Sequence, residues 1–107
     1  DPDCRRCMPW SEIDSSENIE KINTMKKLIM LRRNEEMCRS PHFHFPHSYE
    51  NDRCVEYIKI DEDGNRMEVL INASDVPIKV NLEKEVLFSR EFDGEVLGAN
   101  GTLIRRI

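Results

Sequence analysis

The spacing of the apolar residues changes once along this chain of 107 residues, and that change limits the possible folds more than any other feature. Between residues 17 and 35 the apolar side chains recur about every 3.6 residues, as they do on one side of an α-helix. From Cys54 onward they alternate with polar residues, as in half-buried strands. The sequence therefore predicts one helix followed by a module of strands. The apolar residues of the helix are Ile19, Ile22, Met25, Leu28, Ile29 and Leu31.

Both ends of this helix carry recognisable signals. The segment 14–17, Asp-Ser-Ser-Glu, has the spacing of a capping box with Asp at the cap position, so the helix should begin near Glu17. Arg32 and Arg33 complement the dipole at the other end, which should lie near residue 34 or 35. The apolar stripe is wide for an isolated helix, and we expect it to need a large surface to pack on.

Turn residues divide the second half of the chain into short strands. Cys54–Ile60 and Arg66–Asn72 flank a glycine-containing hairpin loop. Further strands are expected around His42–Phe45, at 78–82, Glu85–Ser89, Glu95–Leu97 and Thr102–Ile107. The predicted fold class is mainly β, with one N-terminal amphipathic helix followed by an antiparallel β-sandwich or barrel-like sheet.

The composition excludes several classes of protein. Lys and Arg total 16 and Asp and Glu total 21, so the net charge is −5. An acidic chain lacks the basic face needed for sequence-neutral nucleic-acid binding. No apolar run approaches the roughly 18 residues of a membrane span. The chain opens without an initiator Met and without a signal-peptide pattern, so we expect a cytoplasmic fragment of a longer polypeptide, or else a processed N-terminus. The 72–74 and 100–102 triplets resemble glycosylation acceptors, but both fall in turn-like sequence where chance explains them.

The cysteines and histidines do not form a regular metal-binding pattern. Cys4-x-x-Cys7 has the spacing of half a zinc site or of a redox pair. A second pair is absent from the sequence, and Pro9 follows where a redox motif would start a helix. We therefore expect no metal and no cofactor, and interpret the cysteines as reduced, partly buried thiols. The other candidates considered are Cys38, Cys54, His42, His44 and His47.

Two segments in the first third of the chain resemble a signature of the α-amylase family of glycoside hydrolases. They are DPDCRRCMPW at 1–10 and MKKLIMLRR at 25–33, with Asn18 between them. The resemblance is strongest to the neopullulanase, cyclomaltodextrinase and maltogenic-amylase branch, where such a loop and helix close the catalytic barrel. The segments 55–82 and 86–107 resemble the C-terminal β domain of that family. Cys7 departs from the pattern, since Pro is common there, and Ser11 stands where Asp often follows the Trp.

The resemblance implies a division of the chain into 1–35, the last barrel loop and helix, and 36–107, the C-terminal β domain. It also implies that Asp1 and Arg5 contact hydroxyl groups of an α-glucan or maltooligosaccharide in the intact enzyme; a mutual Asp1–Arg5 pair that only orders the loop is the alternative. Retaining hydrolysis needs two carboxyl groups about 5–5.5 Å apart. In the family these come from earlier barrel strands, so no catalytic residue is assigned here, and the acidic residues are interpreted as a solvated surface.

A second hypothesis is a free-standing carbohydrate-binding or protein-interaction β module with a docking helix. It predicts that the helix packs on its own sheet and buries Ile22, Met25 and Ile29. An exposed row of aromatic residues, which a sugar platform needs, is not evident among Tyr57, Phe88 and Phe92. If the helix instead belongs to a missing barrel, we expect its apolar stripe to fold back on the sheet or to form a homodimer.

Overall fold

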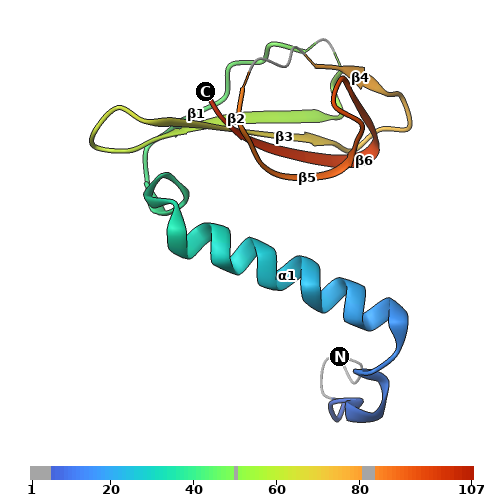
Figure 1. Ribbon diagram of the computed structural model, residues 1–107. Helices are drawn as coiled ribbons and strands as arrows, with labels where there is room; N and C mark the ends of the chain where they lie inside the picture. Colours follow the sequence, from blue (N-terminus) through green and yellow to red (C-terminus); the bar gives the residue numbers. More distant parts are fainter. Residues whose placement is uncertain (1–5, 50, 81–83) are drawn as a thin grey trace.

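The computed structural model describes residues 6–49, 51–80 and 84–107, and these form one extended helix beside a sheet (Figure 1). Two short 3-10 turns precede and follow the helix. Asp1, Cys4 and Arg5 lie outside the described residues. In chain order the elements are η2 (Trp10–Glu12), α1 (Ser16–Asn34), η3 (Glu36–Arg39), β1 (Phe43–His44), β2 (Cys54–Ile60), β3 (Arg66–Asn72), β4 (Ile78–Lys79), β5 (Val86–Phe92) and β6 (Val96–Arg106).

The helix α1 has nearly the predicted bounds but a different cap. The Ser15 side chain, not that of Asp14, accepts a hydrogen bond from the Asn18 backbone N–H at 3.3 Å. Ser15 thus stands at the cap position, one residue later than the capping-box spacing predicted. The Asn18 side chain donates to the Glu12 carbonyl at 2.6 Å, which ties the first turn of α1 to the preceding η2.

All described strands are antiparallel and belong to one hydrogen-bonded sheet with the order β1-β2-β3-β6-β4, from which β5 branches by pairing with β6. The β2–β3 hairpin has the predicted bounds, and its register pairs Cys54 with Asn72 and Ile60 with Arg66. The mainly β, antiparallel fold class is therefore confirmed. The strands curl around β6 as a single sheet, because β6 pairs with three neighbours along its length.

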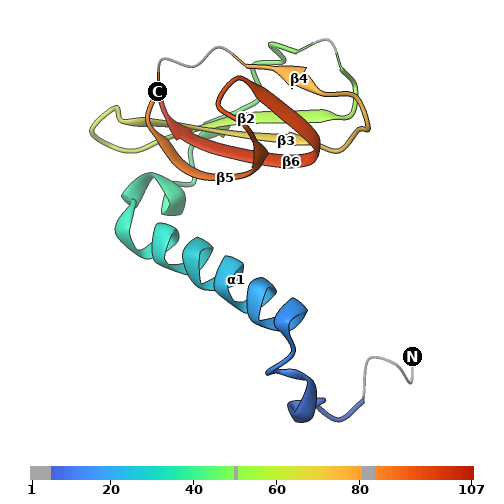
Figure 2. The same cartoon turned by 45° about the vertical axis from the view of Figure 1, so that its right-hand side comes forward.

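Both faces of the sheet are buried at β3. Alternate residues of this strand belong to two apolar clusters, one on each face. On one side Leu70, Leu97 and Leu103 pack with β4. On the other side Met67 and Val69 pack against Met37 of η3. Because η3 connects α1 to β1, this second side is the face of the sheet on which the helix lies. Figures 1 and 2 both show α1 on that side.

The prediction of two separate strands at Glu95–Leu97 and Thr102–Ile107 was wrong. The turn expected at Asn100-Gly101 lies inside the continuous strand β6. Asn100 has φ +57°, and the pairing of β5 with β6 shifts register nearby. A left-handed Asn followed by Gly is the signature of a bulge as well as of a turn, because both need positive φ and close backbone approach.

Gly101 allows this close approach, and replacing it should be costly. A Cβ at Gly101 would lie 2.7 Å from Leu97 Cδ1, 2.8 Å from the Gly98 oxygen and 3.0 Å from the Arg90 oxygen. We expect Gly101→Ala to lower the free energy of unfolding by about 1–3 kcal/mol, the usual range for overpacking. Urea denaturation measures this, and Gly98→Ala is the control, since its nearest neighbour would be the Glu91 oxygen at 3.3 Å. An equal loss in both variants would contradict the explanation.

Because the helix projects from the sheet, the molecule is less compact than a typical domain with the same number of residues. The radius of gyration is 16.3 Å, whereas a compact domain of this length has about 13 Å. In Figures 1 and 2, α1 lies nearest to the sheet at its C-terminal end and extends away from it toward the N-terminus. The helix is thus positioned as a projecting arm of the β module.

Candidate functional site

The predicted substrate-binding residues Asp1 and Arg5 lie outside the described part of the chain. The structure therefore leaves their sugar contacts as a prediction. Trp10, which directly follows that loop, begins η2 and is exposed. The structure describes the whole of the following helix α1, whose surface carries several exposed apolar side chains.

None of the nineteen residues of α1, all of which the structure describes, is buried. Ile22 is 36% exposed, Met25 58% and Ile29 49%. Their spacing places them on one side of the helix, together with exposed Ile19. We call these four residues the outer stripe. Its exposure contradicts the second hypothesis, which requires Ile22, Met25 and Ile29 to be covered by the chain's own sheet.

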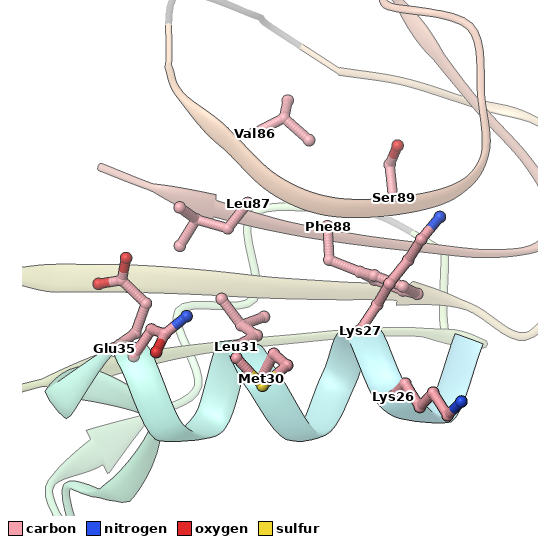
Figure 3. Close-up of a pocket in the computed structure, with 10 residues that line it drawn as sticks. Lys26, Lys27, Met30, Leu31, Glu35, Val86, Leu87, Phe88 and Ser89 are labelled. Carbon is pink, nitrogen blue, oxygen red and sulfur yellow. The ribbon is translucent and has the colours of Figure 1, made fainter. Parts of the chain in front are cut away.

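The opposite side of α1 faces strand β5 across an open groove (Figure 3). Leu31 points toward Leu87, and Lys27 extends toward Phe88, whereas Lys26 points away from the sheet. The groove has a volume of about 720 Å³. The helix therefore carries apolar residues on two sides, and the chain itself partly covers one of them. Such a helix is typical of a position between two packed bodies.

Ion pairs hold the C-terminal end of α1 to the sheet. Arg106 of β6 donates to Glu35, the residue that ends the helix, at 2.7 Å, and to Glu85 at 3.1 Å. Arg39 of η3 donates to the carbonyls of Arg32 and Arg33, which satisfies the last turn of the helix. The attachment of α1 is thus defined by specific polar contacts at one end.

A cluster of aromatic rings lies at the β1–β2 edge of the sheet. The sequence analysis did not predict this cluster. Phe43 and Phe45 are 5.7 Å apart between ring centres, and Tyr57 of β2 lies 6.4 Å from Phe43 and 6.3 Å from Phe45. Phe43 is 56% exposed and Phe45 50%. Val55, two residues before Tyr57 on the same strand, is exposed beside them. We call Phe43, Phe45, Val55 and Tyr57 the aromatic patch.

Two acidic residues in the described part of the chain are buried, contrary to the interpretation of all acidic residues as a solvated surface. Glu68 accepts a hydrogen bond from Arg105, directly opposite on β6, at 2.7 Å, and both side chains are almost fully buried. Glu56 lies on the same side of the sheet and accepts from the Ser48 N–H at 2.9 Å. Burial and the neighbouring Glu56 carboxyl raise the pKa of Glu68, although Arg105 opposes the shift. Strands β2, β3 and β6 hold these three side chains, and Arg105 compensates the buried charge of Glu68.

Of the thiols in the described residues, Cys38 and Cys54 are partly buried as predicted, whereas Cys7 is exposed, contrary to that prediction. Burial raises the pKa of both Cys38 and Cys54, which keeps these thiols protonated and unreactive. Asp61 lies near Glu36 and Asp63, but its carboxylate accepts from the Asp63 and Asn65 N–H groups and caps the hairpin turn. A hydrogen bond from the Asn65 side-chain amide, together with these backbone bonds, lowers the pKa of Asp61. No helix in the described part of the chain is long and apolar enough to cross a membrane.

Comparison with known proteins identifies the fold. A solved structure described as "Putative alpha Amylase from Salmonella typhimurium" matches with a TM-score of 0.68 and 15% sequence identity. The match covers 91% of this chain and 17% of that chain. No protein-family model and no curated protein matches the sequence. The helix-plus-sheet fold is therefore one that occurs as a small part of a much larger polypeptide.

Sequence reasoning found the helix but missed the aromatic patch. The notable signal was Phe43-His-Phe45, with aromatic residues at alternate positions next to a strand bearing Tyr57. Alternation places the two rings on one side of an extended segment. What could not be predicted from spacing was that β1 pairs with β2 in the register Phe43 to Lys59, which brings the rings to Tyr57.

Proposed function

We propose that this chain is the C-terminal segment of an α-glucan-hydrolysing glycosidase of the α-amylase family. In this proposal residues 1–35 are the last loop and helix of the catalytic barrel, and residues 36–107 are the C-terminal β domain that stabilises it. The resemblance of 1–10 and 25–33 favours a cyclomaltodextrinase- or neopullulanase-like enzyme that cleaves α-1,4 bonds with retention, with α-1,6 bonds as a further candidate linkage. The matched region makes up 17% of the chain of the similar solved structure, which is consistent with a segment of a longer enzyme.

The observation that carries the proposal is the uncovered outer stripe of α1. The side chains of Ile19, Ile22, Met25 and Ile29 are all at least 36% exposed. Met25 also lines a groove with Arg90 of β5, whereas the other three lie away from the side of the helix that faces β5. Leaving a large apolar side chain in water forgoes about 1.5–3 kcal/mol relative to burying it. A last barrel helix would bury this stripe against neighbouring barrel elements. The same helix would connect the barrel to the β domain through η3.

The segment itself is proposed to be non-catalytic. Glu56 and Glu68 are the buried acids of the described residues, but Arg105 pairs with Glu68, and both acids lie on the face of the sheet away from α1. The reactive carboxylates would lie on other barrel strands. Asp1 and Arg5 would bind glucan hydroxyl groups only in the assembled cleft, where a carboxylate accepts from hydroxyls and a guanidinium donates to sugar oxygens.

The coding sequence upstream of the Asp1 codon tests this proposal. We expect it to encode alternating strands and helices of a barrel, with a nucleophilic Asp and an acid/base Glu at strand ends. The predicted barrel should lack one final helix, which α1 supplies. An upstream sequence that encodes no such strands would contradict the proposal.

A second candidate, the free-standing carbohydrate-binding or protein-interaction module, rests on the aromatic patch alone, because the exposed outer stripe contradicts the packing of α1 that this module requires. Phe43 and Phe45 are exposed but meet edge to face, so a sugar could stack on only one of the two rings at a time. Calorimetric titration with maltose or cyclodextrin discriminates the two candidates. Saturable binding at millimolar concentration or better would favour the module, and absence of binding would favour the enzyme segment.

A further inference from the structure

Three charged side chains are buried together on the face of the sheet that points away from α1. Glu56 is 6% exposed, Glu68 5% and Arg105 7%. Glu56 pairs with Leu70 in the β2–β3 register, and Glu68 lies two residues before Leu70 on β3. The two acids are thus diagonal neighbours on one face, a separation that long side chains span. Leu70 belongs to the apolar cluster on the face opposite to Met37, so the acids lie beside a packed core.

Each carboxyl group of this pair accepts a hydrogen bond from outside the pair. Arg105 Nε donates to Glu68 Oε1 at 2.7 Å, and the Ser48 backbone N–H donates to Glu56 Oε1 at 2.9 Å. The Glu56 and Glu68 side chains are also hydrogen-bonded to each other. Ionised carboxylates only accept hydrogen bonds, so this bond requires a proton on one of the two groups. Close carboxyl groups retain a proton in this way because two adjacent negative charges repel each other.

We propose that Glu56 and Glu68 share one proton, carried by Glu68 and donated to Glu56, and that this proton forms a pH-dependent link between β3, β2 and the segment that contains Ser48. In this arrangement Glu56 accepts both the Glu68 O–H and the Ser48 N–H, which suits an ionised carboxylate. Arg105 donates to the oxygen of Glu68 that carries no hydrogen. When the pH rises and Glu68 ionises, repulsion replaces the bond between the two acids. The link is therefore strong at acidic pH and weak once both acids are ionised.

The neighbouring groups of the described cluster leave this titration to the two acids. Arg105 stays charged throughout. Tyr49 lies before β2 and Cys54 begins it, and both interact with the pair. Burial raises the pKa of the Tyr49 hydroxyl and of the Cys54 thiol, so both groups stay neutral from acidic to neutral pH. Burial also raises the pKa of Glu68, Arg105 opposes this rise, and the hydrogen bond with Glu56 adds to it.

The shared proton makes the stability of the chain depend on pH. The pKa of Glu68 is raised on folding, so the folded chain binds the proton more tightly than the unfolded chain does. The stabilisation is fully present below the ordinary pKa of glutamate and is lost as the pH rises through the raised value of the folded chain. Burial of Glu68 without proton sharing has the same sign, so a decisive test must follow Glu56 as well.

Carbon-13 NMR of the side-chain carboxyl carbons follows both acids without any substitution. The chain is titrated from pH 4 to pH 8, and Glu62, an exposed residue of the β2–β3 turn, is the internal reference. We expect the Cδ signals of Glu56 and Glu68 to move with one common midpoint above that of Glu62, and the Ser48 amide signal to move with them. A raised midpoint at Glu68 without a response of Glu56 at that pH would overturn the inference. Midpoints of both acids equal to that of Glu62 would overturn it too.

Glu56→Gln gives a second test, because the amide supplies a permanent donor to Glu68 and removes the neighbouring charge. This variant should shift the Glu68 midpoint down to that of Glu62 or lower, and the accompanying fall of the unfolding free energy with rising pH should disappear in urea denaturation. Glu62→Gln, the matched exposed control, should leave the Glu68 midpoint unchanged. A Glu68 midpoint that stays raised in Glu56→Gln would show that burial acts without proton sharing, and would overturn the inference. If Glu56→Gln does not fold, the titration of the unsubstituted chain decides.

Discussion

Arg105→Met should lower the free energy of unfolding at pH 7 by about 3–5 kcal/mol, because it leaves a buried carboxylate without its partner. Glu68 accepts from Arg105 at 2.7 Å, and both side chains are almost fully buried. The neighbouring Glu56 carboxyl adds a second negative charge on the same side of the sheet. Methionine keeps the apolar part of the arginine side chain, so the loss reports mainly on charge.

The loss should depend on pH in a defined direction. The pKa of Glu68 is raised on folding, so the folded protein binds its proton more tightly than the unfolded chain does. The contribution of Glu68 to stability is thus fully present below its ordinary pKa and is lost as the pH rises through the higher value of the folded state. Removing Arg105 raises that value further. The Arg105→Met defect should therefore be small near pH 4 and large near pH 7, as measured by urea denaturation at both values.

Arg106→Met is the matched control. Arg106 also pairs with two glutamates, Glu35 and Glu85, but its side chain is partly exposed. Exposed ion pairs contribute little, so its defect should be much smaller than that of Arg105→Met. A double variant Glu68→Met with Arg105→Met should recover most of the lost stability, since a buried pair can be replaced by apolar residues. Equal defects in Arg105→Met and Arg106→Met, or a defect independent of pH, would contradict this account.

Asn72→Ala should cost about 2–4 kcal/mol of unfolding free energy, because a fully buried amide would be lost. Its side-chain NH₂ donates to the carbonyls of Val76, Leu97 and Gly98 at 2.9, 3.2 and 3.1 Å. Its oxygen accepts from the Ser74 N–H at 3.1 Å and from the Ser74 hydroxyl at 2.6 Å. The amide therefore connects the end of β3 to the following turn and to β6.

Circular dichroism during thermal unfolding would measure the Asn72→Ala defect. Asn65→Ala is the control, because Asn65 is an exposed turn residue whose side chain bonds only Asp61 among the contacts described. Its loss should be much smaller. Comparable defects in the two variants would show that the buried network around Asn72 does not contribute as the geometry indicates. The burial of Asn72 also means that the 72–74 triplet cannot serve as a glycosylation acceptor in the folded chain.

Local periodicity was enough to predict α1 and the β2–β3 hairpin, since their residues alternate or recur without interruption. The sequence also placed the turn residues around Asn72 correctly, because Asn and Ser bond to nearby backbone. It failed at Asn100-Gly101, where the same two residue types form a bulge inside a strand. A turn and a bulge share positive φ, and only the pairing partners distinguish them.

The buried charges could not be predicted for a similar reason. Glu56, Glu68 and Arg105 occupy positions that alternation assigns to one side of the strands, and polar residues there are ordinarily exposed. Their burial depends on the sheet curling so that this side becomes interior. The outer stripe of α1 was predicted from spacing, but its exposure required coordinates. The sugar contacts of Asp1 and Arg5 remain a prediction from the resemblance.

The central claim is that this chain completes a sugar-cleaving enzyme whose reactive carboxylates lie elsewhere in the polypeptide. The most direct test measures release of reducing ends from maltoheptaose and β-cyclodextrin by the full gene product and, in parallel, by the purified segment 1–107. The claim predicts turnover by the full gene product and none by the segment. Turnover by the segment, or none by either protein, would contradict it.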